Sequence, residues 1–406
     1  MNILLLTTYA HGGAGVACRR LQKALQQNGE HAAILTREQM PSRWPFYLER
    51  LSFLPFERDK AVRFAFSLAN FGQDIAHHPA VRKADILHLH WINQGFLSLT
   101  ALKNLAALGK PVVWTLHDMW AFTGGCHYSG NCQRYRQVCG NCPYLRRPAP
   151  KDLSNRIWQR KKAVFPKNLQ LVTCSKWLGA TARESSLFRH YDILSIPNPI
   201  DTASFSPMEA VKRQDFRRET GIPPNTFVLL FVSMKVQEER KGFRYLREAL
   251  HVLKKNMPEL PVTLLVLGAV NPADLDALPY PCHSLGLVKD DALLAKAYSS
   301  ADVFVIPSLE DNLPNTVMES LSCGTPVAGF NTGGIPEMVD HLQNGYIAEQ
   351  RDSQGLANGL QWILAGGPEN LDRLRAAARN KVEKHYAEAV VANQYINLYQ
   401  RLLSGP

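Results

Sequence analysis

The chain has 406 residues, about twice the length of a typical single domain, so two domains with separate cores are expected. Hydrophobic residues make up 46% of it and charged residues 20%, a balance that excludes a fibrous or largely disordered protein. No segment approaches the roughly 20 apolar residues of a membrane-spanning helix, and the start MNILLLTTY lacks the basic region of a signal peptide. A cytoplasmic location, where disulfides are rare, is therefore expected.

The net charge of +11 is unevenly distributed. Residues 1–200 hold 26 of the 46 Lys and Arg but only 11 of the 35 Asp and Glu. A basic half of this kind indicates an anionic partner, either a membrane surface or a nucleic acid, or else a solvated face with no partner. Composition alone leaves these alternatives open.

Short apolar runs alternate with helical patterns along the first half. The predicted strands are MNILLLTTY (1–9), HAAILT (31–36), ADILHLHW (84–91) and PVVWTLHD (111–118), and the predicted helices cover 14–29 and 98–110. Because strands that alternate with helices form parallel sheets with crossovers, this half is expected to be a doubly wound α/β domain.

The second half repeats the pattern. Its predicted strands are FVLLFVS (227–233), VTLLVLG (262–268), ADVFVIPS (301–308) and TPVAGFN (325–331), and its predicted helices cover 245–255, 291–299 and 316–322. The proline-containing segment 196–210 suits a linker, so a boundary is expected near Ile200. The predicted domains are thus 1–200 and 201–386, followed by an amphipathic helix in 387–406 whose apolar face needs a partner surface.

Glycine-rich and charged segments follow the predicted strands. HGGAGVA, with Gly12, Gly13 and Gly15, comes after the first strand and opens a helix whose N-terminus could meet an anion, although a tight turn without a ligand is equally open. In the second half the segments are RKG (240–242), SLEDNLPNTVMES (308–320) and NTGGIPE (331–337). Since carboxyl ends of parallel strands share one edge of a sheet, these segments predict a site for a diphosphate and a polyhydroxylated ligand.

These motifs together resemble the retaining GT-B glycosyltransferases of family 4 over essentially the whole chain. The resemblance rests on GGAG near the start, His117-Asp118, SIPNPIDTASFSP, RKG, the acidic motif with ESLSCGTPV, GGIPE followed by NGY, and a terminal helix. The HDMWAFTGGCHYSG block is similar to a subgroup of the colanic-acid type that makes bacterial exopolysaccharide. The implied fold is two Rossmann-like domains that face a cleft, with the terminal helix crossing back to the first domain.

The resemblance also implies roles for single residues. Glu319 matches the second glutamate of the Glu-x7-Glu motif and implies contact with the donor ribose, while the first glutamate falls on Asp311, a shorter acid near the donor sugar. Lys241 matches the diphosphate-binding lysine, and because the usual preceding arginine is absent, Arg240 or Lys235 is the expected substitute. His117 matches the histidine beside the reacting sugar. The other residues implied at the donor and acceptor are Gly12, Gly13, Gly15, Asn312, Asn315, Thr316, Gly333 and Gly334.

The implied activity is glycosyl transfer, with retention, from a nucleotide diphosphate sugar to a saccharide or polyprenyl-diphosphate-linked acceptor. Cations and backbone dipoles would stabilise the leaving diphosphate, so no cofactor is expected for catalysis. A sugar-nucleotide epimerase or hydrolase would use the same donor without an acceptor. A nucleic-acid-binding protein would use the basic half, but it leaves the strand-end motifs of the second half unexplained, so no nucleic acid is expected.

Four cysteines crowd the loop 126–142 as Cys126, Cys132, Cys139 and Cys142. Only the last pair has the short spacing usual in zinc sites, yet four thiolates would complete a tetrahedral site, so one hypothesis is a structural Zn²⁺. The alternative is four reduced thiols in a loop held by its aromatic residues.

Two basic segments rich in aromatic residues, 43–71 and 153–165, are candidates for contact with an anionic membrane on the inner face of the plasma membrane. The alternative is core packing of the aromatic rings with incidental charge. For 43–71 the alternative is slightly favoured by the sequence.

Overall fold

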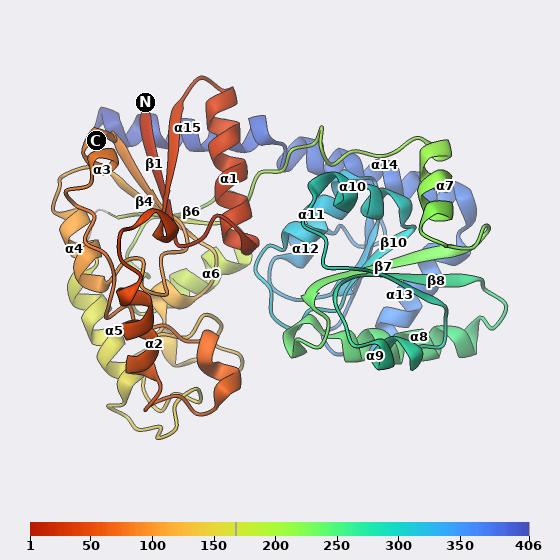
Figure 1. Cartoon of the computed structure of the whole chain (residues 1–406), viewed down its shortest axis with the longest axis horizontal. Coiled ribbons are helices and arrows are strands. Elements are labelled where there is room, and N and C mark those ends of the chain that lie inside the picture. The colour runs from red at the N-terminus through yellow and green to blue at the C-terminus, as the bar shows by residue number, and fades with distance from the viewer. Residues whose placement is uncertain (167–168, 406) are drawn as a thin grey trace. The chain divides into compact units, whose positions relative to one another are not determined.

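A computed structural model describes residues 1–166 and 169–405. The chain divides into two compact units: unit 1 is Met1–Pro199 with Ala389–Pro406, and unit 2 is Ile200–Glu388. Each unit contains one six-stranded parallel sheet with helices on its faces (Figure 1). The predicted fold class, two doubly wound α/β domains in tandem, is therefore confirmed.

The sheet of unit 1 has the strand order β2-β1-β3-β4-β5-β6. Its strands are β1 (Asn2–Thr7), β2 (His31–Thr36), β3 (Ile86–Leu89), β4 (Val112–Leu116), β5 (Gln170–Thr173) and β6 (Ile193–Ser195). Its helices are α1 (Gly12–Gln27), α2 (Trp44–Phe53), α3 (Pro79–Lys83), α4 (Leu99–Ala106), α5 (Leu153–Val164), α6 (Lys176–Glu184) and α15 (Glu388–Ser404). The strand order reverses between β1 and β3, so their carboxyl ends are where a doubly wound domain binds ligands.

Helix α15 completes the core of unit 1 although it lies far along the chain from the sheet. Its buried residues Val391, Tyr395, Leu398 and Tyr399 pack in one cluster with residues of β1 and α1. The Tyr399 hydroxyl lies 2.7 Å from Nδ1 of the fully buried His88, and the Tyr395 hydroxyl lies 2.9 Å from Oγ1 of Thr115. The helix is therefore held by both apolar packing and hydrogen bonds.

Substitution of Tyr399 by phenylalanine should destabilise unit 1 by about 1 to 3 kcal/mol, because Nδ1 of the fully buried His88 would lose its hydrogen-bond partner. The free energy of unfolding in urea measures this loss. The matched control is Tyr47→Phe, whose side chain is 51% exposed and which should change stability by less than about 0.5 kcal/mol. Equal stabilities of the two variants would contradict the anchoring role of Tyr399.

The sheet of unit 2 has the order β12-β11-β10-β7-β8-β9. Its strands are β7 (Phe227–Lys235), β8 (Val262–Ala269), β9 (Cys282–Gly286), β10 (Val303–Ile306), β11 (Val327–Phe330) and β12 (Gly345–Ala348). Its helices are α7 (Ala210–Glu219), α8 (Phe243–Asn256), α9 (Pro272–Asp276), α10 (Asp291–Ser300), α11 (Asn315–Ser322), α12 (Ile335–Met338), α13 (Ser353–Ala365) and α14 (Gly367–His385). Here the order reverses between β7 and β10.

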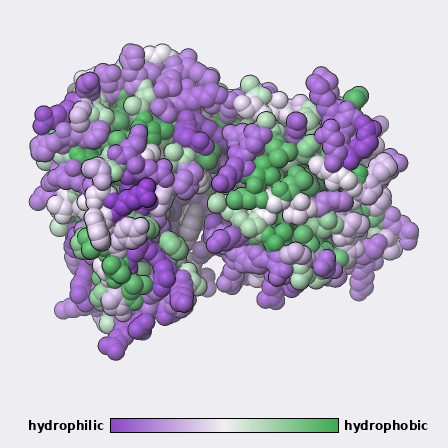
Figure 2. Space-filling view, in the orientation of Figure 1, coloured by the Kyte–Doolittle hydropathy of each residue, from purple (hydrophilic) through white to green (hydrophobic). Residues whose placement is uncertain are grey.

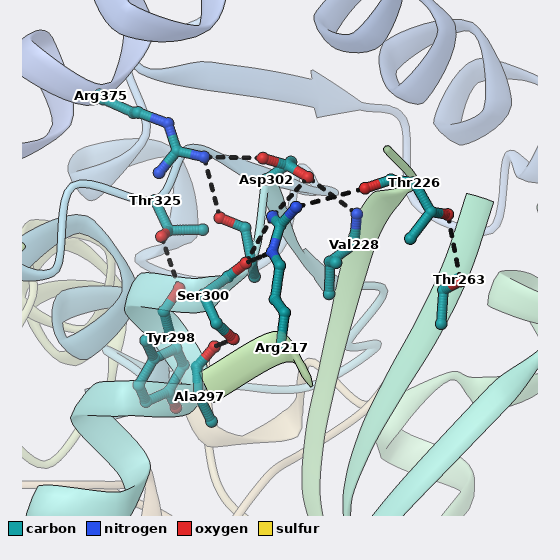
Figure 3. A network of polar contacts seen from close by, with 11 residues as sticks. Arg217, Thr226, Val228, Thr263, Ala297, Tyr298, Ser300, Asp302, Thr325 and Arg375 are labelled. Carbon is teal, nitrogen blue, oxygen red and sulfur yellow. Dashed lines mark hydrogen bonds and ion pairs between the residues drawn. The ribbon is translucent and has the colours of Figure 1, made fainter. Parts of the chain in front are cut away.

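A buried carboxylate joins α7, α14 and the sheet of unit 2. Asp302 accepts hydrogen bonds from Arg217 Nη2, Arg375 Nη2 and the Val228 backbone N–H, each at 2.8 Å (Figure 3). Arg217 also donates to the carbonyl of Ser300, at the end of α10. Since Asp302 directly precedes β10, this network fixes the strand at the reversal point against two helices.

Candidate donor and acceptor sites

The loops after β7 and β10 meet where the strand order of unit 2 reverses. Lys241, in the short 3₁₀ turn Glu239–Lys241 before α8, places its Nζ 2.7 Å from Oδ2 of Asp311, in the loop after β10. Both side chains are mostly buried, 19% exposed for Lys241 and 13% for Asp311.

Arg240 lies at the edge of the same pair. Its Nη1 is 4.0 Å from Oδ2 of Asp311, and its Nε donates to Glu238. Lys235, the other candidate for the second cation, is exposed at the end of β7. The structure therefore brings Arg240 to Lys241 and Asp311, whereas no ion pair connects Lys235 to them among the described residues.

The glycine turn after β11 packs directly on the loop after β10. A Cβ atom at Gly333 would lie 1.7 Å from the carbonyl oxygen of Asp311, and the Gly333 φ of +56° also favours glycine. The Gly334 N–H donates to the carbonyl of Asn312 at 2.6 Å. Any side chain at position 333 would therefore separate two loops that carry predicted site residues.

Helix α11 follows this loop with an N-terminus that no side chain caps. Pro314 occupies the cap position, the first turn holds no acidic residue, and Asn315 and Thr316 are half-buried there. The helix dipole favours an anion at this end. Glu319, one turn further along, is buried, and its Oε2 accepts a hydrogen bond from the Tyr298 hydroxyl at 3.1 Å.

In unit 1 the glycine loop forms the start of α1. Gly12 has a φ of +72°, and a Cβ atom at Gly15 would lie 2.4 Å from the carbonyl oxygen of Tyr9. A Cβ atom at Gly13 would meet nothing within 4 Å. Gly15 therefore lets α1 begin close against the end of β1, and the helix N-terminus has neither a side-chain cap nor an acidic residue in its first turn.

Three imidazole rings lie in a row across β3 and the end of β4. His117, directly after β4, places its Nε2 3.0 Å from Nδ1 of His90. The centre of the His90 ring lies 4.3 Å from the centre of the His88 ring. Burial lowers the pKa of His117 to about 4 and that of His88 to about 3, and burial together with the neighbouring imidazoles lowers the pKa of His90. His117 is therefore neutral at pH 7, with Nε2 directed at His90 and Nδ1 4.0 Å from Sγ of Cys174.

Unit 1 should lose stability as the pH falls from about 6.5 towards 4. In the unfolded chain each histidine has a pKa near 6.5, above the folded values of His88 and His117, so the unfolded state binds more protons in this window. Each of them then costs up to about 1.4 kcal/mol per pH unit. Urea unfolding across this range measures the slope, and His88→Asn should make it shallower. A slope that this variant leaves unchanged would contradict the prediction.

The sequence did not indicate the surroundings of Asp118. Its Oδ2 accepts from His127 Nδ1 at 2.6 Å and from Trp91 Nε1 at 2.8 Å, and His127 Nε2 lies 2.9 Å from Ser67 Oγ. The hydrogen bonds from His127 and Trp91 hold the pKa of Asp118 below its usual range although burial acts in the opposite direction. The available signals were HLHW directly after a strand, and a second histidine nine residues after Asp118.

The four cysteines of the loop 126–142 line one small cavity of ≈ 20 Å³. Burial raises the pKa of Cys139 to about 11 and that of Cys142 to about 12, and all eight cysteines of the chain are free thiols. Within residues 1–166 and 169–405 no three His, Cys, Asp or Glu side chains form a group that could hold a metal ion. The zinc hypothesis stays a prediction, which metal analysis of the purified protein would test.

The expectation that the basic segment 153–165 exposes its aromatic side chains is wrong. The segment forms α5, whose Trp158 is buried in the main core of unit 1. Lys161 is fully buried too, donates to the carbonyls of Trp120 and Thr123, and has its pKa lowered to about 7 by burial. In the described part of the chain, no helix has the length and apolar character needed to span a membrane.

Two family models match the chain in tandem. The model described as Glycosyltransferase Family 4 covers residues 11–204, and the model described as Glycosyl transferases group 1 covers residues 226–366. Each match falls almost entirely within one unit. The chain spans about half the length of the first curated relatives it matches, from 45% to 61%.

One relative and two solved structures illustrate the similarity. A protein of Escherichia coli provisionally named a colanic acid biosynthesis glycosyl transferase is 24% identical over 80% of this chain and 77% of its own. A glycosyltransferase from Rickettsia africae has a TM-score of 0.70 at 15% identity, over 100% of this chain and 99% of its own. HepE of Anabaena, solved with UDP-glucose, has a TM-score of 0.63 at 16% identity, over 98% and 99%. The structural neighbours share the GT-B fold with this chain.

Proposed function

We propose that this chain, which belongs to the glycosyltransferases with a family 4 domain followed by a group 1 domain, transfers a glycosyl group to a saccharide acceptor. The donor in this proposal is a nucleotide diphosphate sugar. The configuration of the transferred sugar is retained. The observation that carries the proposal is the Lys241–Asp311 pair at the strand reversal of unit 2, beside Arg240 and the Gly333-Gly334 turn. The position suits a ligand that is both anionic and rich in hydroxyl groups.

The chemistry follows from where charge develops. Cleavage of the bond between the sugar and the diphosphate leaves negative charge on the β-phosphate, and preorganised cations and backbone N–H groups stabilise it most when they need not reorganise. Lys241 and Arg240 supply the cations, and the uncapped N-terminus of α11 supplies N–H groups. The leaving diphosphate would then accept the acceptor's proton while the acceptor attacks the same face of the sugar.

Carboxylates would fix the rest of the donor. Asp311 accepts hydroxyl donors of the transferred sugar while it holds Lys241, and Glu319 would accept from the ribose. UDP-glucose bound to HepE of Anabaena makes a uridine nucleotide the first donor class to test.

We also assign the acceptor to surface polysaccharide synthesis, with the growing saccharide on a polyprenyl diphosphate. The name of the Escherichia coli relative and the basic first half of the chain support this assignment. A lipid-linked acceptor would put the reaction at the inner face of the plasma membrane.

A thermal-shift screen with UDP-, GDP-, dTDP- and ADP-sugars tests the donor site. A donor present at 100 times its Kd should stabilise the folded protein by about 2.7 kcal/mol, so one nucleotide class should raise Tm clearly above the others. Turnover of that donor should then depend on an added saccharide acceptor. If no nucleotide raises Tm, the donor site is assigned wrongly; donor consumption without acceptor would instead indicate a hydrolase.

A further inference from the structure

Helix α2 presents an apolar face to the solvent. Trp44, Tyr47, Leu48 and Leu51 follow the i, i+3, i+4, i+7 spacing that places side chains on one side of a helix, and all four are exposed. Trp44 is 71% exposed and Leu51 59%. We call the exposed residues Trp44, Tyr47, Leu48, Leu51, Leu54 and Phe64 the α2 patch; Figure 2 displays hydrophobic residues in green over α2, at the lower left.

The opposite face of α2 is fixed to unit 1. The buried carboxylate of Glu49 accepts hydrogen bonds from four successive backbone N–H groups, those of residues 68 to 71, at 2.6 to 3.1 Å. Phe53 stacks on Phe66 at 5.0 Å between ring centres, and both are buried. The helix therefore cannot turn its apolar face inward without breaking these contacts, so the α2 patch is a rigid part of the surface.

Phe64 is attached to the same surface by a cation–π contact. The guanidinium of Arg50, on α2, lies 4.2 Å from the centre of the Phe64 ring and donates to the carbonyl of Arg63. Phe64 is 62% exposed despite this contact. An isolated exposed apolar residue is ordinary, but six in one anchored region exceed what a soluble surface usually shows.

Cationic side chains border the α2 patch, while the acids in its segment are buried or ion-paired. Arg43, Arg58 and Lys60 are exposed in the segment itself. The exposed Arg146 and Arg147 adjoin it, because the Arg146 N–H donates to the carbonyl of Phe56 at 2.9 Å. Of the acids, Glu49 is buried, Glu57 is paired with Arg63, and the exposed Asp59 is paired with Arg58, which leaves Arg43, Lys60, Arg146 and Arg147 as the main charges of the border. The border is therefore mainly positive.

We propose that the α2 patch docks on the surface of an anionic lipid bilayer. Tryptophan, tyrosine, leucine and phenylalanine side chains on one helix face can enter the headgroup region, and a basic border is attracted to anionic lipids. The expectation that core packing explains the aromatic residues of 43–71 holds for only some of them, such as Phe53 and Phe66, because others, such as Trp44, are exposed. The docking proposal rests on the proposed function only in that a lipid-linked acceptor would give the docking its purpose.

Flotation of the purified full chain with lipid vesicles tests the docking. The protein should float with vesicles of phosphatidylcholine and phosphatidylglycerol at low salt, and much less with phosphatidylcholine alone or at high salt. The double variant Trp44→Ser, Leu51→Ser should reduce binding at least about tenfold. Arg146→Gln with Arg147→Gln should reduce it roughly fivefold for each residue replaced.

The matched control replaces equally exposed apolar residues of unit 2. Val211 is 71% exposed and Met234 66%, so Val211→Ser with Met234→Ser removes similar apolar surface away from the α2 patch and should leave flotation unchanged. Unchanged Tm values would establish that all variants fold.

Three outcomes would overturn the proposal. The first is that the wild-type chain does not bind anionic vesicles. The second is that the control variant loses binding as much as the Trp44, Leu51 variant. The third is that light scattering finds a wild-type dimer that is absent in the Trp44, Leu51 variant, which would make a second copy of the chain the occupant of the patch. The donor-induced Tm shift should be the same in all variants. Loss of flotation with that shift intact concerns docking alone, whereas absence of the shift concerns the proposed function.

Discussion

Replacement of Lys241 by alanine should lower kcat for glycosyl transfer by about 10²- to 10³-fold, the effect of removing one preorganised charge stabiliser from a developing anion. The same variant should lose most of the Tm shift that the donor produces, because Lys241 would also hold the diphosphate in the ground state. Initial rates at saturating acceptor, together with thermal melting with and without donor, measure both effects.

The control for Lys241 is Lys255→Ala, an exposed lysine near the end of α8 in the same unit, which should leave rate and Tm shift unchanged. Lys241→Ala removes both the charge and the length of the side chain, so Lys241→Met, which keeps most of the length but not the charge, serves as a second variant; in both, Asp311 keeps only Arg240, at 4.0 Å. A rate within a factor of three of wild type for both variants would reject the role of Lys241 in charge stabilisation.

Replacement of Asp302 by alanine should destabilise unit 2 by about 3 to 5 kcal/mol, since it leaves the guanidinium groups of Arg217 and Arg375 buried without their carboxylate. The backbone N–H of Val228 loses its acceptor as well, at the start of β7. Urea unfolding followed by circular dichroism should display an earlier transition for unit 2.

Asp340→Ala provides the comparison for Asp302. Asp340 forms one ion pair, with Lys381 at 2.9 Å, and its side chain is 39% exposed, so its loss should cost at most about 1 kcal/mol. If the two variants unfold at the same urea concentration, the buried network of Figure 3 does not carry the stability assigned to it.

The sequence predicted the fold class because the central strands are unmixed apolar runs. β1, β7, β8 and β10 are buried on both faces of their sheets and are therefore continuous in Val, Ile, Leu and Phe. Of the outer strands, β2 was predicted, but β6 and β9 gave no comparable signal. β9 is CHSLG and half-exposed, and β6 has three residues, so tertiary pairing rather than composition makes them strands.

For the site, sequence position predicted proximity where the topology is simple. Lys241 and Asp311 both follow strands that are neighbours in the sheet, so their contact follows from strand order. The direction in which a side chain points was harder to predict from the sequence. The basic run around Trp158 suggested a surface, but the helix turns Lys161 and Trp158 inward, whereas α2 turns Trp44 outward because Glu49 anchors its other face. Both helices contain charges beside aromatic rings, and only packing distinguishes them.

The place of α15 in unit 1 bears on the order of events during translation. The sheet of unit 1 is synthesised first, but the helix that covers Ile3, Leu5 and Ile86 follows only after the whole of unit 2. At a ribosomal rate of roughly 5 to 20 residues per second, this delay lasts about 10 to 40 s. During that interval the nascent chain exposes these apolar residues on a nearly complete domain, so general chaperones should bind there, and release should coincide with the emergence of Tyr395 and Tyr399.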